Sequence, residues 1–174
     1  MQPTHPLKVL KFCPKCGSPE LIPKADLSLK CSDCGFHFYV NAAAAVAALV
    51  VNKEGKLLLT RRAVEPDYGK LDLPGGFIDP GESAEEAVKR ELWEELCMKV
   101  KSVEYVVSAP NAYLFSDISV FTLDMAFRVV PETVSGLKAQ DDILDFKFYA
   151  ENEIDFSQIP APSINFFVQQ FFRK

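Results

Sequence analysis

Residues 75–98 read GGFIDPGESAEEAVKRELWEELCM, and this stretch decides how the chain folds. It opens with turn-forming residues, and Ser83 is followed three residues later by Glu86, an arrangement known as a capping box that begins a helix. We therefore expect a helix over Ala84–Met98. The apolar residues that recur at helical spacing, and that should anchor this helix to a core, are Val88, Leu92 and Leu96.

Three carboxylates crowd one face of this expected helix. Glu91, Glu94 and Glu95 stand at positions i, i+3 and i+4, which brings their side chains together. Like charges this close destabilise a helix, so the crowding suggests a compensating cation, and oxygen-only ligands select a hard ion such as Mg²⁺ or Mn²⁺. A solvated acidic helix face is the simpler interpretation. It does not account for the Pro-Gly-Gly loop before the helix or for Glu82 just before the start of the helix.

The stretch resembles the Nudix box, which reads Gly, five residues, Glu, seven residues, Arg-Glu, an aliphatic residue, any residue, Glu-Glu, any residue, Gly and an aliphatic residue. The positions that match are Gly76, Glu82, Arg90, Glu91, Leu92, Glu94, Glu95 and Met98. One position departs, because Cys97 stands where the family has Gly. That Gly takes a left-handed backbone at the helix end, so we expect Cys97 to cost about 1 kcal/mol of stability without affecting metal ligation.

The resemblance implies a metal-dependent pyrophosphohydrolase, which uses water to split a diphosphate joined to another group. In this family divalent metals neutralise the pyrophosphate oxygens and lower the pKa of the attacking water. Carried over to this chain, Glu91 and Glu95 would be the main ligands of Mg²⁺ or Mn²⁺, and Glu94 would be a ligand or base. Arg90, four residues before Glu94, would orient the carboxylates. The expected catalytic residues are therefore Arg90, Glu94 and Glu95.

Two further acids are expected near the metals. The resemblance implies that Glu82 is either an outer metal ligand or a residue that contacts the ligands. Family members often draw another acid from a later loop, and for that role Asp142 is our candidate while Asp141 is its rival. The loop residues that we expect to contact substrate are Gly75, Gly76 and Phe77.

Four cysteines precede the acidic helix as two Cys-x-x-Cys units; they are Cys13, Cys16, Cys31 and Cys34. A Gly follows each unit, where the backbone must fold back toward sulfur. Four thiolates close a tetrahedral shell, so the spacing predicts a zinc ribbon with a structural Zn²⁺. Redox-active cysteine pairs are the alternative. His37 could replace a ligand, although a ring packed in a strand with Phe36 and Tyr39 is its simpler role.

A four-cysteine ribbon before a Nudix domain resembles the NADH pyrophosphatase branch, which also acts on NAD-capped RNA. Tyr39 matches a substrate-contacting Tyr of that branch. The branch has Ser-Gln-Pro-Trp-Pro-Phe-Pro-x-Ser, of which Ser108 and Pro110 survive, whereas residues 111–115 replace the core and predict a more flexible loop. Its Ser-Ile-Ala becomes Ser-Ile-Asn at residues 163–165, and its N-terminal subdomain is missing. The remaining candidate substrate residues are Ser108, Tyr113, Phe115 and Asn165. Tyr113 and Phe115 could stack on a base, or they could be core aromatics beside a strand.

The chain from about Val40 onward alternates between strand and helix patterns. The expected strands are 43–51, 56–61, 101–108, 120–130 and 145–150, with a polar loop at 63–73 and a closing helix at 163–172. Strands on both sides of the central helix predict an α/β domain with a mixed sheet, and the resemblance implies the Nudix α/β/α sandwich. Residues 1–10 look like a loose tail, so we divide the chain into 1–38, tail and zinc ribbon, and 39–174, the Nudix domain.

The net charge of −5 argues against a protein built mainly to coat nucleic acid. We expect a cytoplasmic protein, because the first ten residues lack an apolar signal and the most apolar run, Ala42–Val51, is too short to span a bilayer. The expected partner is a small nucleotide substrate such as ADP-ribose, NAD(H) or a nucleotide sugar; nucleic acid enters only as a capped RNA end, and a homodimer is compatible with the sequence. The competing hypothesis is a non-catalytic Nudix domain that senses a nucleotide while the ribbon contacts nucleic acid.

Overall fold

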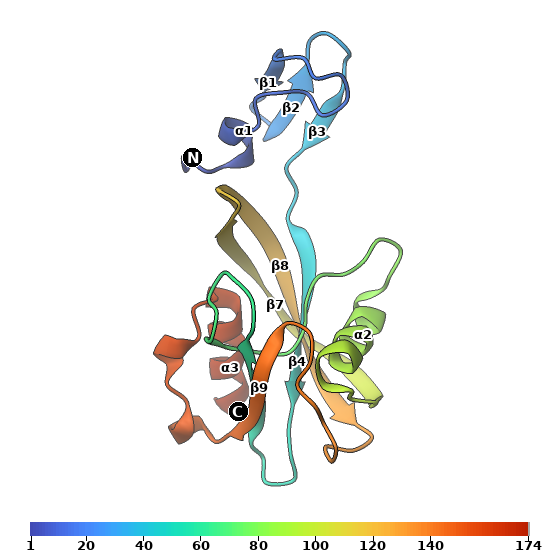
Figure 1. Cartoon of the computed structure of the whole chain (residues 1–174), viewed down its shortest axis with the longest axis vertical. Coiled ribbons are helices and arrows are strands. Elements are labelled where there is room, and N and C mark those ends of the chain that lie inside the picture. Colours follow the sequence, from blue (N-terminus) through green and yellow to red (C-terminus); the bar gives the residue numbers. More distant parts are fainter. Residues whose placement is uncertain (174) are drawn as a thin grey trace. The chain divides into compact units, whose positions relative to one another are not determined.

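The computed structural model describes residues 1–173, which form two compact units (Figure 1). The cysteine-rich unit contains Met1–Ala42 together with Ala112–Phe121, and the larger unit contains Ala43–Asn111 and the chain from Thr122 onward. Among the described helices, none has the length and apolar character needed to cross a membrane.

The cysteine-rich unit is built on a small antiparallel sheet of order β1-β2-β3. Its elements are α1 (Pro6–Val9), β1 (Leu21–Pro23), β2 (Ser28–Cys31) and β3 (His37–Tyr39). Leu7 of α1 is only 4% exposed and belongs to the same apolar cluster as Leu21 and Leu29. The prediction that residues 1–10 form a loose tail is therefore wrong, because the apolar side chain of Leu7 is part of the core of this unit.

The N-terminal segment also binds the turn segment that belongs to the same unit. The backbone N–H of Ser119 donates to the carbonyl oxygen of Thr4 at 2.8 Å, and the two hydroxyls lie 2.7 Å apart. The rings of His5 and Phe121 are 5.3 Å apart. These contacts explain why residues far apart in the sequence form one unit.

The larger unit contains two three-stranded sheets, with strand orders β4-β8-β7 and β6-β5-β9. The strands are β4 (Ala43–Val50), β5 (Leu57–Arg62), β6 (Leu71–Asp72), β7 (Val100–Phe115), β8 (Ile118–Pro131) and β9 (Ile143–Tyr149). The adjoining ends of β7 and β8, within Ala112–Phe121, belong to the cysteine-rich unit. The helices are α2 (Ala84–Leu96) and α3 (Pro162–Phe172), with 3-10 turns η1 (Glu151–Glu153) and η2 (Phe156–Gln158). Because β4 runs parallel to β8 while β5 is antiparallel to β6 and β9, the expected mixed arrangement is confirmed.

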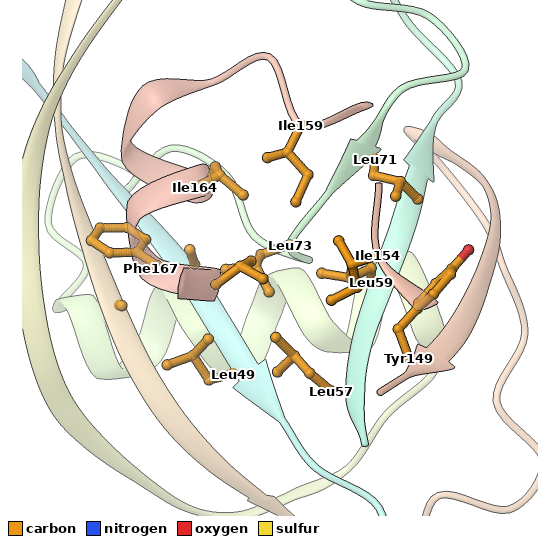
Figure 2. Packing of buried hydrophobic residues seen from close by; sticks show 13 residues of the cluster. Leu49, Leu57, Leu59, Leu71, Leu73, Tyr149, Ile154, Ile159, Ile164 and Phe167 are labelled. Atoms are coloured by element: carbon orange, nitrogen blue, oxygen red, sulfur yellow. The ribbon is translucent and has the colours of Figure 1, made fainter. Parts of the chain in front are cut away.

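The two long helices cover opposite faces of β4. Val46 faces an apolar core that includes Leu92 of α2, whereas Ala47 and Leu49 face a second core that includes Phe167 of α3. Figure 2 shows this second core, between α3 and the strands. Successive residues of a strand point to opposite faces, so the alternation along β4 produces the expected α/β/α sandwich.

The segment 63–73, expected to be a polar loop, requires a correction. It contains strand β6, which pairs with β5, and Leu71 and Leu73 are each 4% exposed in the core. A strand of two residues is too short to show a period in the sequence, so its burial comes from pairing with β5.

Strand β7 requires a second correction. It continues through Pro110 to Phe115 and does not end at Ser108 as expected. β7 lies at the edge of its sheet, where a strand tolerates a proline because one row of N–H groups makes no ladder bonds. Residues 111–115 are consequently strand, and the flexible loop predicted there is wrong.

Candidate active site

Helix α2 begins where the capping box predicts. The hydroxyl of Ser83 accepts from the N–H of Glu86 at 3.3 Å, and Oε2 of Glu86 accepts from the N–H of Ser83 at 2.9 Å. The residues that anchor the helix are fully buried, as expected; they are Val88, Leu92 and Leu96. The sequence therefore defines both the start of the helix and its buried face.

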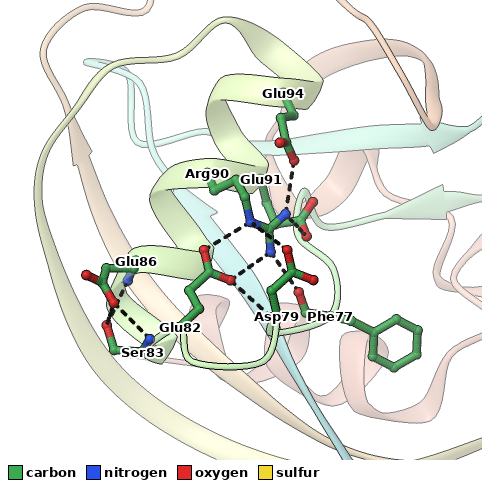
Figure 3. A network of polar contacts seen from close by, with 8 residues as sticks. All are labelled: Phe77, Asp79, Glu82, Ser83, Glu86, Arg90, Glu91 and Glu94. Carbon is green, nitrogen blue, oxygen red and sulfur yellow. Dashed lines mark hydrogen bonds and ion pairs between the residues drawn. The ribbon is translucent and has the colours of Figure 1, made fainter.

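Arg90 lies at the centre of a carboxylate network beside α2 (Figure 3). Its Nε and Nη2 donate to the two oxygens of Glu82 at 3.0 and 2.9 Å, and its Nη1 donates to Glu91 at 2.8 Å and Glu94 at 3.0 Å. Nη2 also donates to the carbonyl oxygen of Phe77 at 2.9 Å. The hydrogen bonds from Arg90 lower the pKa of Glu82. The guanidinium thus joins the loop and three acids of the helix region in one charged network.

Glu95 is the buried member of the acidic row. It is 5% exposed, and its Oε2 accepts from the N–H of Gly75 at 3.1 Å. Burial raises the pKa of Glu95 well above its ordinary value, the charges of Glu91 and Asp72 raise it further, and the bond from Gly75 opposes them. A carboxylate in such a place is stabilised in its ionised form by a nearby cation, which is what a ligand of a divalent metal requires.

The other two acids of the row differ in their exposure. The side chain of Glu91 is 13% exposed and that of Glu94 is 44% exposed. Burial raises the pKa of Glu91, while the hydrogen bond from Arg90 lowers it. The acidic row therefore runs from solvent at Glu94 to the interior at Glu95, which separates a water-accessible carboxylate from two that are suited to hold a metal.

The two glycines ahead of the helix are required by close packing. A Cβ atom on Gly76 would lie 2.5 Å from Oε1 of Glu91, and one on Gly75 would lie 2.1 Å from the carbonyl oxygen of Val46. The loop is also bonded to β4, since the N–H of Val46 donates to the carbonyl oxygen of Gly76 at 2.9 Å. Any side chain at these positions would separate the loop from either the sheet or the acids.

Helix α2 ends at Leu96 and not at Met98 as expected, because Cys97 adopts the left-handed conformation that the resemblance implies for this position. Cys97 has φ 53° and ψ 30°, and its N–H donates to the carbonyl oxygen of Trp93 at 2.9 Å, while the N–H of Met98 donates to that of Leu92 at 3.0 Å. The Nε2 atom of Gln140 lies 2.8 Å from the sulfur of Cys97. A cysteine in this position keeps the shape of the helix end while adopting a backbone conformation that favours glycine.

The loop before β9 reaches the buried end of the acidic row. The N–H of Gln140 donates to the carbonyl oxygen of Glu95 at 2.9 Å. Burial is the main cause of the raised pKa of Glu95, and the charge of Asp142 adds to it. Asp142, the expected candidate from this loop, therefore lies close enough to act on Glu95, whereas Asp141 serves the turn with a left-handed φ of 53°.

A partly buried ion pair next to the loop was not expected from the sequence. Nη1 of Arg62 donates to Oδ2 of Asp72 at 2.9 Å, and Oδ1 of Asp72 accepts from the N–H of Leu73 at 2.8 Å. Burial raises the pKa of Asp72, and Arg62 opposes the shift. The only hint of this ion pair in the sequence was an acid between Leu71 and Leu73, just before the Pro-Gly-Gly turn. Its pairing with Arg62 could not be predicted, because the burial of Asp72 is created by tertiary structure.

Three expected substrate residues lie in the larger unit, in different settings. Phe77 is 47% exposed, and Ser108 is half-buried in β7. The side-chain amide of Asn165 donates to the carbonyl oxygens of Phe156 at 3.0 Å and Ile159 at 3.3 Å. Phe77 therefore presents a free aromatic surface beside the acidic network, while the amide of Asn165 is engaged within the protein.

The other three expected substrate residues belong to the cysteine-rich unit. Tyr39 is 49% exposed and its ring lies 4.5 Å from that of His37. Tyr113 and Phe115 stand in β7, where Phe115 is 55% exposed. His37 is outside the cysteine cluster, since its Nε2 lies 2.7 Å from the hydroxyl of Ser28. His37 therefore has the simpler of the two roles considered for it, that of a ring packed in strand β3.

The four cysteines come together as a group that could hold a metal ion. The sulfurs of Cys13 and Cys34 are 3.6 Å apart, those of Cys16 and Cys31 are 3.7 Å apart, and all four lie within 4.8 Å of one another. Four sulfurs around a zinc ion, each at about 2.3 Å, are separated by roughly 3.8 Å. The N–H of Gly17 folds back to the carbonyl oxygen of Cys13, not to sulfur. The donor set and its spacing fit tetrahedral zinc.

Comparison with known proteins gives consistent results. A family model described as the NUDIX domain matches residues 41–168. The NAD-capped RNA hydrolase NudC of Haemophilus influenzae is 33% identical over 121 residues, which cover 69% of this chain and 46% of that protein. The ADP-ribose pyrophosphatase of Methanocaldococcus jannaschii is 35% identical over 140 residues, which cover 79% of this chain and 75% of that protein. The chain thus spans less than half the length of the NudC relative.

Solved structures show the same fold. A NUDIX hydrolase from Nitrosomonas europaea superposes with a TM-score of 0.67 at 25% identity, covering 94% of this chain and 91% of that one. The MutT protein of Methanosarcina mazei superposes with a TM-score of 0.56 at 25% identity, covering 76% of this chain and 94% of that one. The first of these matches extends over nearly the whole chain and so includes most of both compact units.

Proposed function

The chain belongs to the Nudix family, and we propose that it is a metal-dependent pyrophosphohydrolase that cleaves a nucleoside diphosphate joined to another group. The observation that carries the proposal is the carboxylate of Glu95, which is buried at the end of an acidic row and bonded to the N–H of Gly75. A buried acid beside Glu91 is stabilised when a cation binds, so the arrangement supports metal ligation better than a solvated acidic face.

The residues divide into roles according to their surroundings. Glu91 and Glu95 are the proposed main ligands of Mg²⁺ or Mn²⁺, and the further candidates are Glu94, Glu82 and Asp142. A bound metal neutralises the diphosphate oxygens and lowers the pKa of the attacking water. Both oxygens of Glu82 are engaged by Arg90, which supports an outer role for that acid. Glu94, the exposed member of the row, is the candidate base.

The cysteine cluster is proposed to hold a structural Zn²⁺, because four thiolates leave no open position for a reacting water. In functional terms we retain residues 1–38 as the ribbon and 39–174 as the catalytic part. Cytoplasmic location, where thiols remain reduced and can bind metal, is part of this proposal.

The proposed substrates are ADP-ribose and dinucleotides such as NAD(H), with RNA involved only through a capped end. The relatives named as an ADP-ribose pyrophosphatase and a NAD-capped RNA hydrolase support this class. The carbonyl oxygen of Phe77 accepts from Arg90, while its exposed ring points away from the acidic network (Figure 3) and would stack on a base there. The backbone of Gly76 would approach the diphosphate, because the side-chain position that it leaves empty faces the carboxylate of Glu91.

The test is an assay of purified protein with ADP-ribose, NAD, NADH and a nucleotide sugar, each with Mg²⁺ or Mn²⁺, with nucleotide products separated by chromatography. We expect metal-dependent release of AMP from at least one adenosine compound. Glu95→Gln keeps the shape of the side chain and removes its charge, and should lower turnover by roughly 10² or more. The matched control is Glu85→Gln, an exposed acid on the same helix, which should leave turnover unchanged.

Two outcomes would contradict the proposal. Unchanged turnover in Glu95→Gln would remove that residue from the mechanism. Binding of nucleotides without hydrolysis under any metal condition would instead support a non-catalytic domain that senses nucleotides.

A further inference from the structure

Asp124 is a buried acid that none of the roles above uses. It lies in β8, is 6% exposed, and its Oδ2 accepts a hydrogen bond from the hydroxyl of Ser163 at the start of α3. Among the residues that the structure describes, Oδ1 of Asp124 has no hydrogen-bond partner. The hydroxyl of Thr122, two residues earlier on the same face of the strand, also lacks a partner within the described chain.

Half-satisfied carboxylates are rare inside proteins, because a buried acceptor without a donor loses the hydrogen bonds that water would supply. Arg62 does not remove this cost, because its guanidinium is hydrogen-bonded to Asp72 at 2.9 Å. The pKa of Asp72 is raised first by burial, and the charge of Asp124 contributes to the rise, so the two acids are close neighbours. Oδ1 of Asp124 would therefore be stabilised by a hydrogen-bond donor from outside the chain.

The register of the strands places Asp124 near the loop of the active site. Asp124 is paired with Ala45 of β4, and Ala45 is bridged in turn to Phe77. Paired residues on neighbouring strands point to the same face, and the strands are about 4.8 Å apart, so Phe77 and Asp124 are separated by roughly 10 Å on one face. The backbone of Phe77 is bonded to Arg90, which connects this row to the acidic network.

The surface between Phe77 and Asp124 is lined by very small side chains. Ala43 is paired with Thr122 and Ala45 with Asp124, so β4 contributes only methyl groups here. Ala43 is exposed and Ala45 is half-buried, whereas the rest of β4 is covered from Val46 onward. The row therefore consists of the exposed ring of Phe77, the half-buried methyl group of Ala45 and the buried carboxylate of Asp124.

We propose that Asp124 binds the ribose of the substrate nucleoside, with its free Oδ1 accepting a hydrogen bond from a ribose hydroxyl. This rests on the proposed function, and it adds a residue that selects ribonucleosides. A base stacked on Phe77 places its ribose over the methyl group of Ala45, between the ring and Asp124. A carboxylate is an acceptor only, and ribose hydroxyls are donors that acidic residues commonly bind in nucleotide sites. Ser163 holds the other oxygen and so fixes the direction of the free one.

The experiment measures binding, so that its result does not depend on hydrolysis. Calorimetric titration with AMP, 2′-deoxy-AMP, 3′-deoxy-AMP and IMP should show that wild-type protein prefers AMP over at least one deoxy compound by tenfold or more, about 1.4 kcal/mol. Asp124→Leu, which has similar branching and no acceptor, should reduce this preference to within about threefold. Leu123→Asn changes the adjacent exposed residue on the opposite face and should keep the full preference.

The proposal is overturned if wild-type protein binds AMP and both deoxy compounds equally, or if Asp124→Leu keeps the preference. Discrimination against IMP alone would assign the donor to the base amine and would also overturn the ribose assignment. Asp124→Asn retains one acceptor oxygen and provides the second variant, with an intermediate preference expected, if the leucine variant melts near assay temperature. Selective binding without any hydrolysis would refute the proposed function and leave this inference standing.

Discussion

The N–H of Gly75 donates to Oε2 of Glu95 at 3.1 Å, which links the turn before helix α2 to an acid in its last turn. The same turn is attached to β4 through Gly76 and to the network of Arg90 through the carbonyl oxygen of Phe77. The backbone of the loop is thus fixed at three points around the acids. In this arrangement a buried carboxylate is prepared for a cation before any ligand arrives, and its consequences can be measured.

Replacing Glu95 with Gln should stabilise the protein when divalent metal is absent. Below about pH 4.5 the acid is protonated in both the folded and unfolded states and contributes no difference. As pH rises the unfolded chain ionises first, because burial raises the pKa of Glu95 in the folded state, so the wild-type protein loses stability through this window. We expect Glu95→Gln to melt several degrees higher at pH 8 and nearly equally at pH 4, since about 1 kcal/mol moves Tm by roughly 2–4 °C in a protein of this size.

Thermal melts check this expectation. They are first recorded with a chelator that removes divalent metal from the acidic site but leaves zinc bound, and are then repeated with Mg²⁺ added. Added Mg²⁺ should raise Tm of the wild type and not of the variant. If the variant melts below the wild type at pH 8, the ionised carboxylate of Glu95 does not destabilise the folded protein.

Replacing Arg90 with Lys should lower kcat by roughly tenfold or more, while the charge is retained. Arg90 holds Glu82 through Nε and Nη2 and both Glu91 and Glu94 through Nη1, and a lysine ammonium cannot reproduce that planar fork. The acids should then be poorly oriented, so a higher Mg²⁺ concentration should be needed for half-maximal rate. Steady-state kinetics against a metal series measure both effects. Lys89→Arg is the control at the neighbouring exposed position, and equal metal curves for Arg90→Lys and wild type would argue against the orienting role.

The cysteine cluster should contain one zinc per chain after purification without added metal. Elemental analysis of wild-type protein and of Cys34→Ser gives the comparison, and the variant should lose the zinc and most of the order of the cysteine-rich unit, since a segment this small depends on its metal. Cys97→Ser is the matched control, because the fifth cysteine lies outside the cluster. Zinc retained in Cys34→Ser, or zinc-free wild type with unchanged melting, would argue against a structural metal.

Replacing Cys97 with Gly should stabilise the folded protein by up to about 1 kcal/mol, since the left-handed cap strains any residue with a Cβ. The gain is partly offset by loss of the contact between the sulfur and Gln140, 2.8 Å apart. Cys97→Ala separates the two effects, because alanine keeps the strain and removes the sulfur. Urea denaturation should therefore order the stabilities as Gly above Cys above Ala, and a glycine variant less stable than alanine would contradict the cap argument.

The parts that could be predicted from sequence are those in which the signal is local. Ser83 and Glu86 define a helix start within four residues, and Cys97 marks its end, because capping depends on neighbouring backbone groups. Leu7 and Asp72 were misjudged or missed for the opposite reason: their burial arises from contacts with residues distant in sequence. The free oxygen of Asp124 is likewise invisible in a sequence, since only the packed structure shows which donors are absent around it.

Substrate preference is the most demanding prediction, and we expect that NADH is not the best substrate. Loop flexibility does not contribute to this preference, since residues 111–115 are strand and not the flexible loop expected there. The expectation depends on a lost stacking surface. The single tryptophan of the chain is Trp93 in α2. The segment after Ser108 therefore lacks the large ring that the NADH pyrophosphatase branch has there.

The other altered position also favours a smaller substrate. Asn165 stands where that branch has Ala, and its amide is engaged by backbone carbonyls of Phe156 and Ile159, so its longer side chain takes up volume without offering those donors to a ligand. Each of the two changes should weaken the binding of a second nucleoside, and ADP-ribose should compete well. The measurement is kcat/KM for NADH, NAD and ADP-ribose under one metal condition. A preference for NADH above tenfold, about 1.4 kcal/mol of transition-state discrimination, would contradict this prediction.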